Sequence, residues 1–213
     1  MEQSSIFYWG PYVERTTIPE HIRKYLLEEG NKVKYNIDFD ASKTLAGHLE
    51  HQYSYPKDIQ KKFYTDIIPI LQNYRKGHCM YHGLDNLNVE LEPINLWINF
   101  MQPGDFNPIH IHNGDYTFVT FLDVPDELTE EIKEWRKNHT SYAPGEIHFD
   151  YTTPTRPKWA TTARAITPKT GDMIIFPTLL SHWVAPYKSK CTRISVSGNL
   201  RIANRENLPN DYF

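Results

Sequence analysis

The second half of the chain alternates between polar and apolar residues in short runs, which is the pattern of β-strands. Residues 95–100 (NLWINF) alternate between polar and apolar side chains and end at the turn-forming residues 102–105 (QPGD). Residues 116–124 (YTFVTFLDV) carry aromatic and β-branched side chains on both faces, as a buried strand does. Two further strands are predicted over 172–176 and 193–200, each beside a turn.

The first third reads mainly as helices. Thr17-Ile18-Pro19-Glu20 has the form of a capping box, which predicts a helix over 21–29 with Gly30 as its C-terminal stop. A second helix is predicted over 57–74, ending before Lys76-Gly77, and Pro69 should kink or split it.

Residues 126–165 are polar and contain several prolines, so they predict a short helix over 127–137 followed by a long insertion. Long insertions in compact domains often act as lids, and Trp159 is the aromatic residue that such a lid would carry. The order of elements predicts an α+β chain with a barrel or sandwich core. We expect one domain over 1–213, in which 1–92 supply helical support and the first strands and 93–202 the core.

Composition is that of a globular protein of 213 residues, with 39% hydrophobic residues. The spacing of the two cysteines fits neither a disulfide framework nor a metal-binding motif. This favours a reducing, cytoplasmic compartment (a host cytosol, if a phage encodes the chain). No apolar run is long enough for a bilayer, so no membrane partner is expected. Residues 156–205 hold nine Lys/Arg against one acid, which indicates either a solvated basic face or a site for an anion such as a carboxylate. Nucleic-acid binding is not indicated.

The candidate chemistry begins with two histidines at alternate positions. On an extended strand, His110 and His112 point the same way and can converge on one metal ion. Asp115 follows the turn-forming Asn113-Gly114 and could swing back toward the same point. His182 follows a strand and a proline-led bend, where a residue at a barrel rim would lie. Imidazole and carboxylate ligands suit Fe, Zn, Cu or Ni and leave coordination positions open.

A second candidate lies eleven residues after His182, where Arg193-Ile194-Ser195-Val196-Ser197 alternates in period two. Arg193 and Ser195 therefore share a face, where a guanidinium can hold a carboxylate through two parallel bonds and a hydroxyl can add a third. Asn95, Asn99 and Asn199 could face the same site from neighbouring strands, or could satisfy backbone groups instead. Trp97, Tyr116 and Trp183 could line a substrate pocket, or could be ordinary core aromatics.

Together these residues resemble the 2-oxoglutarate/Fe(II)-dependent dioxygenase superfamily, and in particular the small oxygenases of marine bacteriophages and bacteria. The resemblance covers roughly residues 93–202. It is carried by the segments Trp97-Ile98-Asn99, Asn107-Pro108-Ile109-His110-Ile111-His112-x-Gly114-Asp115, Phe118-Val119, Gly171-Asp172-x-x-Ile175-Phe176-Pro177, and His182-Trp183-Val184-x-Pro186 through Arg193-Ile194-Ser195-Val196-Ser197-Gly198-Asn199.

The resemblance implies a double-stranded β-helix (jelly roll, cupin-like) with the N-terminal helices packed on one sheet. It also implies Fe(II), 2-oxoglutarate and O2 as cofactors, and hydroxylation of an unidentified small-molecule or peptidyl substrate. Catalysis would depend on His110, His112, His182 and Arg193. The co-substrate would be bound by Arg193 and Ser195, with Asn99 and Asn199 as further candidate contacts.

One position departs from the superfamily pattern, in which a carboxylate usually follows the first histidine by two residues, because residue 112 is His. Either His110, His112 and His182 form an all-histidine triad, or Asp115 supplies the carboxylate in place of one of the first two. We favour the triad, with Asp115 in contact with the metal or nearby.

Two other interpretations remain open. Gly104 to His112 also satisfies the cupin pattern Gly-x5-His-x-His, so a cupin-type metal enzyme or binding module that does not use 2-oxoglutarate is an alternative. A metal-free structural phage protein on the same barrel is another. The sequence does not indicate the main substrate or the oligomeric state.

Overall fold

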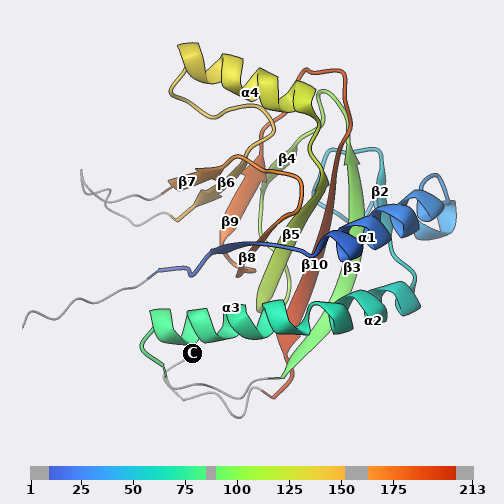
Figure 1. Cartoon of the computed structure of the whole chain (residues 1–213), viewed down its shortest axis with the longest axis vertical. Coiled ribbons are helices and arrows are strands. Elements are labelled where there is room, and N and C mark those ends of the chain that lie inside the picture. Colours follow the sequence, from blue (N-terminus) through green and yellow to red (C-terminus); the bar gives the residue numbers. More distant parts are fainter. Residues whose placement is uncertain (1–9, 85–89, 152–162, 205–213) are drawn as a thin grey trace, which may run out of the picture.

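The computed structural model describes residues 10–84, 90–151 and 163–204. These residues form a mixed α/β structure with two antiparallel sheets, one of six strands in the order β1-β8-β5-β10-β3-β2 and one of four in the order β4-β9-β6-β7 (Figure 1). Consecutive strands alternate between the two sheets from β3 to β6, so the chain winds around the space between them.

Long strands form the centre of the six-stranded sheet. Its members are β1 (Glu14–Thr17), β2 (Gln52–Ser54), β3 (Leu91–Met101), β5 (Tyr116–Asp123), β8 (Asp172–Pro177) and β10 (Arg193–Ile202). The four strands predicted from the alternation are therefore confirmed as β3, β5, β8 and β10, with ends that differ by a few residues. β1 and β2 lie within 1–92, where first strands were expected, but their positions were not predicted, because runs of three or four residues carry too little periodicity.

Short strands form the second sheet, which consists of β4 (Asn107–His110), β6 (Ile147–Asp150), β7 (Ala163–Ile166) and β9 (Ser181–Val184). The segment predicted as a short helix followed by a long insertion, residues 126–165, also contributes two of these strands, β6 and β7. The short helix is confirmed as α4 (Asp126–Asn138), which projects at one end of the molecule (Figure 1). Trp159, the proposed lid residue, lies outside the described residues.

Three helices cover the six-stranded sheet, namely α1 (Glu20–Val33), α2 (Lys57–Asp66) and α3 (Ile68–Tyr81), and a 3-10 turn, η1, spans Ile37–Phe39. Pro69 does split the predicted second helix, since it occupies the first turn of α3. That helix continues past Gly77 to Tyr81.

The predicted ends of the first helix are wrong at both sides. Thr17 belongs to β1, so it is no cap, and α1 begins after Pro19 without a side-chain cap. Gly30 lies inside α1, which ends at Val33. A Cβ at Gly30 would collide with Ile98 of β3, so glycine here permits close packing of helix on sheet.

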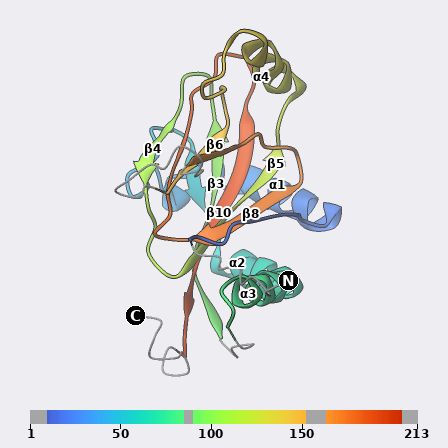
Figure 2. The ribbon, with the colours of Figure 1, turned by 90° about the vertical axis from the view of Figure 1, so that its left-hand side faces the viewer.

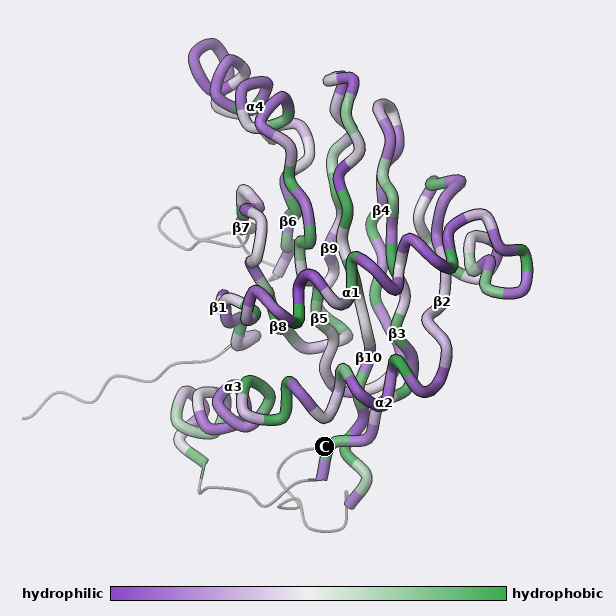
Figure 3. The backbone as a smooth tube through the Cα atoms, turned by 45° about the vertical axis from the view of Figure 1, so that its right-hand side comes forward, coloured by the Kyte–Doolittle hydropathy of each residue, from purple (hydrophilic) through white to green (hydrophobic). Residues whose placement is uncertain are grey.

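The core divides into two layers because side chains on the six-stranded sheet alternate between its faces. Leu96, Ile98 and Phe100 of β3 pack with Val196 and Leu200 of β10 against the helices. The helices in turn present mixed hydrophilic and hydrophobic segments along their length (Figure 3).

The opposite face of the six-stranded sheet packs on the smaller sheet. Met101, Phe121 and Phe176 contact Ile147 and Phe149 of β6 in this second layer. Figure 2 shows the resulting order, with β4 on the side opposite α1. Within the described residues, no helix is long and apolar enough to cross a membrane.

Candidate metal centre

A cavity of about 270 Å³ lies between the two sheets. The inward-facing residues of β3, β5 and β10 line one wall, and residues of β4, β6 and β9 line the other. Residues 44–47, just before β2, line it as well. All three predicted metal-ligating histidines and Arg193 line this cavity.

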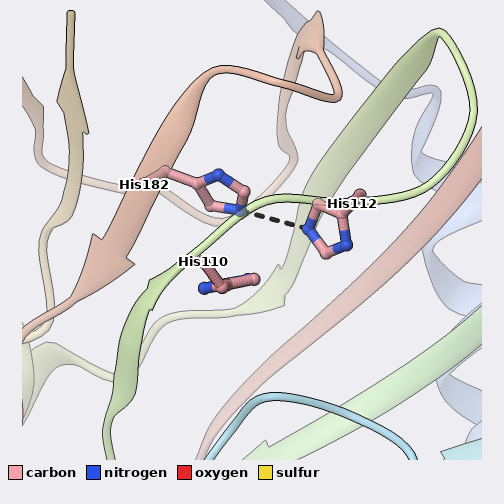
Figure 4. Close-up of side chains that lie close together, drawn as sticks. All are labelled: His110, His112 and His182. Carbon is pink, nitrogen blue, oxygen red and sulfur yellow. Dashed lines mark hydrogen bonds between the residues drawn. The ribbon is translucent and has the colours of Figure 1, made fainter.

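Three histidines converge at the smaller sheet. His110 ends β4 and is the register partner of His182 on β9. His112 lies two residues beyond β4, where its backbone N–H donates to Thr178 O at 2.9 Å. One ligand atom from each of the three rings lies within 4.8 Å of the other two. Figure 4 shows the rings turned toward one another from these separate segments.

Backbone carbonyls fix two of the rings. His110 Nδ1 lies 2.7 Å from Pro108 O, and His182 Nδ1 lies 2.9 Å from Leu180 O. A carbonyl can only accept, so each Nδ1 carries the proton and each Nε2 keeps its lone pair. This arrangement is typical of metal-ligating histidines, whose second nitrogen is held by a hydrogen bond. Two of the three rings are therefore oriented by the carbonyl two residues before them in the chain.

Ring spacing and charge agree with a shared cation. His112 Nε2 and His182 Nε2 lie 3.1 Å apart. Two nitrogens bound at a right angle to one ion at typical lengths would lie about 3 Å apart. Burial lowers the pKa of His182 to about 3 and that of His112 to about 4, and it also lowers the pKa of His110. All three rings are thus neutral at pH 7, as ligands must be.

The structure does not bring Asp115 into this group. Its carboxylate accepts a 2.7 Å hydrogen bond from Ile202 N, and its own N–H donates to Leu200 O at 2.8 Å. Asp115 thereby ties the turn before β5 to the end of β10. Among the described residues, the group that could hold a metal consists of His110, His112 and His182.

Arg193 is the largest of the nearly inaccessible side chains, at 2% exposure. Its Nη1 donates to Gly145 O at 2.7 Å, and its guanidinium lies 5.4 Å from the centre of the Phe121 ring. Its Nε has no hydrogen-bond partner, and none of the ion pairs among the described residues involves it. Burial lowers its pKa to about 10. A buried guanidinium without a carboxylate is costly unless an anion enters the cavity.

A polar row adjoins Arg193. Ser195 is the register partner of Asn99, and Asn99 Nδ2 lies 3.5 Å from Ser195 Oγ. Gln52 Nε2 in turn donates to Asn99 Oδ1 at 2.8 Å. Sequence reasoning missed Gln52, because β2 is too short to be recognised from its pattern. Asn199 faces the same cavity, but it lies six residues beyond Arg193 on β10.

The three candidate pocket aromatics differ in position. Trp97 lines the cavity, and its ring centre lies 5.8 Å from that of His112. The other two do not line this cavity. Tyr116 packs in the helix-side core. Trp183 donates to Asp150 and stacks on His148, because it alternates with the inward-facing His182.

Comparison with known proteins agrees with this site. Residues 95–199 match the family described as "Putative 2OG-Fe(II) oxygenase". No curated protein matches the sequence closely enough to count as a relative. The matched segment contains the three histidines, Arg193 and Ser195.

Solved structures show the same fold at low sequence identity. A Pseudomonas putida prolyl-4-hydroxylase has a TM-score of 0.57 and 12% identity, over 90% of this chain and 93% of that one. A viral collagen prolyl hydroxylase from Paramecium Bursaria Chlorella virus-1, in a 2OG complex, has a TM-score of 0.55 and 16% identity, over 90% and 97%. A Trichoplax adhaerens prolyl hydroxylase, in complex with a hypoxia inducible factor peptide fragment, has a TM-score of 0.56 and 12% identity, over 93% of this chain and 85% of that one.

The matched family defines the class of protein that this chain resembles: residues 95–199 match the 2-oxoglutarate/Fe(II) oxygenase family, and the overall fold agrees with it. The chain is an oxidoreductase, a dioxygenase that depends on Fe(II), 2-oxoglutarate and O2.

Proposed function

We propose that this dioxygenase holds Fe(II) on His110, His112 and His182 and binds the distal carboxylate of 2-oxoglutarate on Arg193, assisted by Ser195. The observation that carries the proposal is the buried Arg193 guanidinium, which faces the same cavity as the histidines and lacks an acidic partner among the described residues. A dicarboxylate supplies that partner and reaches toward the metal with its other end.

The donor set fits this metal but departs from the usual His-x-acid pattern. Three neutral imidazoles suit Fe(II), and they also suit Zn, Cu or Ni. In a His-x-acid site, a protein carboxylate neutralises part of the charge of the metal ion. Here no such carboxylate is present in the triad, so the co-substrate neutralises more of that charge. We therefore expect metal and 2-oxoglutarate to bind with strong mutual dependence.

The bound Fe(II), with 2-oxoglutarate and O2, supplies the oxidising chemistry. The residues of the chain position and shield it. Pro108 O and Leu180 O hold the His110 and His182 rings through their Nδ1 protons. Gly145 O fixes the Arg193 guanidinium, and Asn99 bonds Ser195 Oγ, so the Ser195 proton is free to point to the carboxylate. Phe121, Phe176 and Val184 line the cavity and exclude water.

Two structural predictions belong to this proposal. Strands β3 to β10 are proposed to form a double-stranded β-helix, which the sheet orders β8-β5-β10-β3 and β4-β9-β6-β7 support. The chain is proposed to be one domain, since a single core cluster joins the N-terminal helices to strands from β3 to β10.

The reaction proposed is hydroxylation of a small-molecule or peptidyl substrate. Support comes from the solved structures of similar fold, which are prolyl hydroxylases, one of them in complex with a peptide. Their identity to this chain is too low to transfer a substrate, so the substrate class has to come from the cavity itself.

The test is the weak visible charge-transfer band expected when Fe(II) and 2-oxoglutarate are added together without oxygen. The parent protein should show the band, and Arg193→Met should not show it at the same co-substrate concentration. Arg164→Met, on the exposed strand β7, is the matched control and should behave as the parent. A cupin-type enzyme that does not use 2-oxoglutarate would give no band in any variant, and an unchanged band in Arg193→Met would refute the role of Arg193.

A further inference from the structure

The cavity is rich in carboxamides and poor in charge. Among the described residues that line it, Arg193 is the one lysine, arginine, aspartate or glutamate. Six carboxamide side chains line it as well: Gln52, Asn95, Asn99, Asn107, Asn113 and Asn199. The histidines are taken up as metal ligands in the proposed function, and the remaining walls away from Arg193, as far as the structure describes them, carry no charged side chain. They recognise a ligand through uncharged hydrogen bonds and apolar contact.

Two of the carboxamides, Asn95 and Asn199, lie at the opposite end of β10 from Arg193. The register places Arg193 beside Met101, Ser195 beside Asn99, Ser197 beside Trp97, and Asn199 beside Asn95. Asn199 lies six residues after Arg193, a distance of about 20 Å along the strand, which is further than one five-carbon diacid reaches. The pair formed by Trp97 and Ser197, beside the His112 ring, lies between Arg193 and Asn199. Asn95 and Asn199 therefore remain for a second ligand.

Asn199 lines the cavity, and one of its buried polar atoms makes no hydrogen bond. Its side chain is 5% exposed, and its Oδ1 has no hydrogen-bond partner. Its backbone N–H donates to Asn95 Oδ1 at 3.2 Å, which fixes the two carboxamides relative to each other. A buried carbonyl oxygen without a donor costs about as much as a lost hydrogen bond, and a ligand N–H or O–H would remove that cost.

Building on the proposed function, we propose that Asn95 and Asn199 bind the part of the main substrate that enters beside the metal. This part is a small neutral group that carries an N–H or O–H donor, a carboxamide being the simplest example. A carboxylate or phosphate has no donor for Asn199 Oδ1. An ammonium would be desolvated with no acidic side chain to pair with, and an apolar group would leave Asn199 unsatisfied.

The size of the cavity limits the same group. About 270 Å³ is shared by the co-substrate and whatever enters with it. Pockets for drug-sized ligands are typically larger than this, roughly 300–1,000 Å³. The substrate therefore inserts one group of side-chain size, and the rest of a larger substrate stays outside, near residues 44–47 at the edge of the cavity.

The test uses three small probes of similar size: acetamide, acetate and methylammonium. Each is titrated into protein loaded with Zn(II) and 2-oxoglutarate, while NMR follows the side-chain amide signals of Asn95 and Asn199. Acetamide should shift both signals and should bind at least about tenfold more tightly than either charged probe, the equivalent of one or two hydrogen bonds. The exposed Asn138 is the internal control and should not respond.

Two variants sharpen the outcome. Asn199→Leu should lose acetamide binding yet still bind Zn(II) and 2-oxoglutarate, and its backbone spectrum reports that it is folded. Asn199→Asp should lose the preference for acetamide and bind methylammonium instead. Equal or tighter binding of acetate, or no response of Asn199 to acetamide, would overturn the substrate class while leaving the oxygenase assignment intact. If 2-oxoglutarate itself fails to bind the loaded parent, the proposed function is wrong.

Discussion

The six-stranded sheet and the four-stranded sheet meet at one cavity and contribute to it in different ways. β10 of the larger sheet pairs along its length with β3 and β5, and it presents Arg193, Ser195, Ser197 and Asn199 in a regular row. The smaller sheet has strands of four residues, and its pairing of β4 with β9 is irregular between Asn107 and His110. Its histidines lie at or beyond strand ends, where carbonyls of Pro108 and Leu180 orient them.

This difference separates two kinds of buried polar group. The histidines lose their charge on burial, because their pKa values fall well below 7. Arg193 keeps its charge, because even the lowered pKa of about 10 leaves it protonated. The smaller sheet is thus prepared for a cation and the larger sheet for an anion. A change in one sheet should therefore have little effect on the ligand of the other sheet when that ligand is measured alone, although the two ligands strengthen each other when both are present.

The largest expected effect comes from removing a ligand of the smaller sheet. His182→Ala should weaken metal binding by more than the ~10–100-fold typical of losing an outer partner of a ligand. Arg193→Met should bind metal alone within about threefold of the parent, because Arg193 does not belong to the histidine group. Metal titrations of both variants without 2-oxoglutarate measure this contrast. Similar metal loss in both variants would mean that the sheets do not act separately.

Acid should destabilise the metal-free protein through the same histidines. The unfolded chain protonates His182 near pH 6.5, whereas burial holds its pKa near 3 in the folded state. Between these values the unfolded state binds more protons, so the free energy of unfolding falls as pH drops below 6.5, by up to about 1.4 kcal/mol per pH unit from this residue. Urea unfolding at pH 7, 6 and 5 measures the slope. His182→Gln should reduce it, and an equal slope in both proteins would contradict the assignment.

Arg193→Met should stabilise the protein without ligands while abolishing co-substrate binding. Replacing an unpaired buried cation by an apolar side chain removes a desolvation penalty, which we expect to be worth about 1 kcal/mol. For a chain of this size, that raises the melting temperature by roughly 2–4 °C. Thermal unfolding with and without Fe(II) and 2-oxoglutarate measures both effects. A lower melting temperature in the ligand-free variant would show that the Gly145 O contact outweighs the penalty.

The smallest effect is expected from Gln52→Leu, which removes the donor to Asn99 and loosens Ser195. Loss of one neutral hydrogen bond at a distance from the ligand should cost about 0.5–1.5 kcal/mol, so the Kd for 2-oxoglutarate should rise roughly 2–10-fold. The metal affinity should stay unchanged. Gln72→Leu, on the exposed side of α3, serves as the control. A change in metal affinity without a change in co-substrate affinity would mean that Gln52 supports the metal ligands and not the Ser195 side of the site.

The sequence was enough to predict the long strands, the histidines and the Arg193–Ser195 pair, because each is recognised from the spacing of residues that are close together in the chain. Period-two alternation identified β3, β5, β8 and β10, and it placed Arg193 and Ser195 on one face. The histidine pair and His182 were recognisable by residue type and order. The positions of the short strands β1, β2, β6, β7 and β9 were not predicted, since three or four residues adopt strand geometry only when a neighbour pairs with them.

By itself, then, the sequence determined which residues could bind a metal and a carboxylate, because ligand chemistry and alternation belong to neighbouring residues. Only the tertiary structure placed His112, and not Asp115, beside the other two histidines, since the turn that carries Asp115 directs its carboxylate to the backbone of Ile202. Likewise, only the packing of the two sheets left Arg193 buried without an acid and gathered carboxamides from residues 52 to 199 around one cavity. Burial and the pairing of distant segments depend on the whole chain, and no local pattern encodes them.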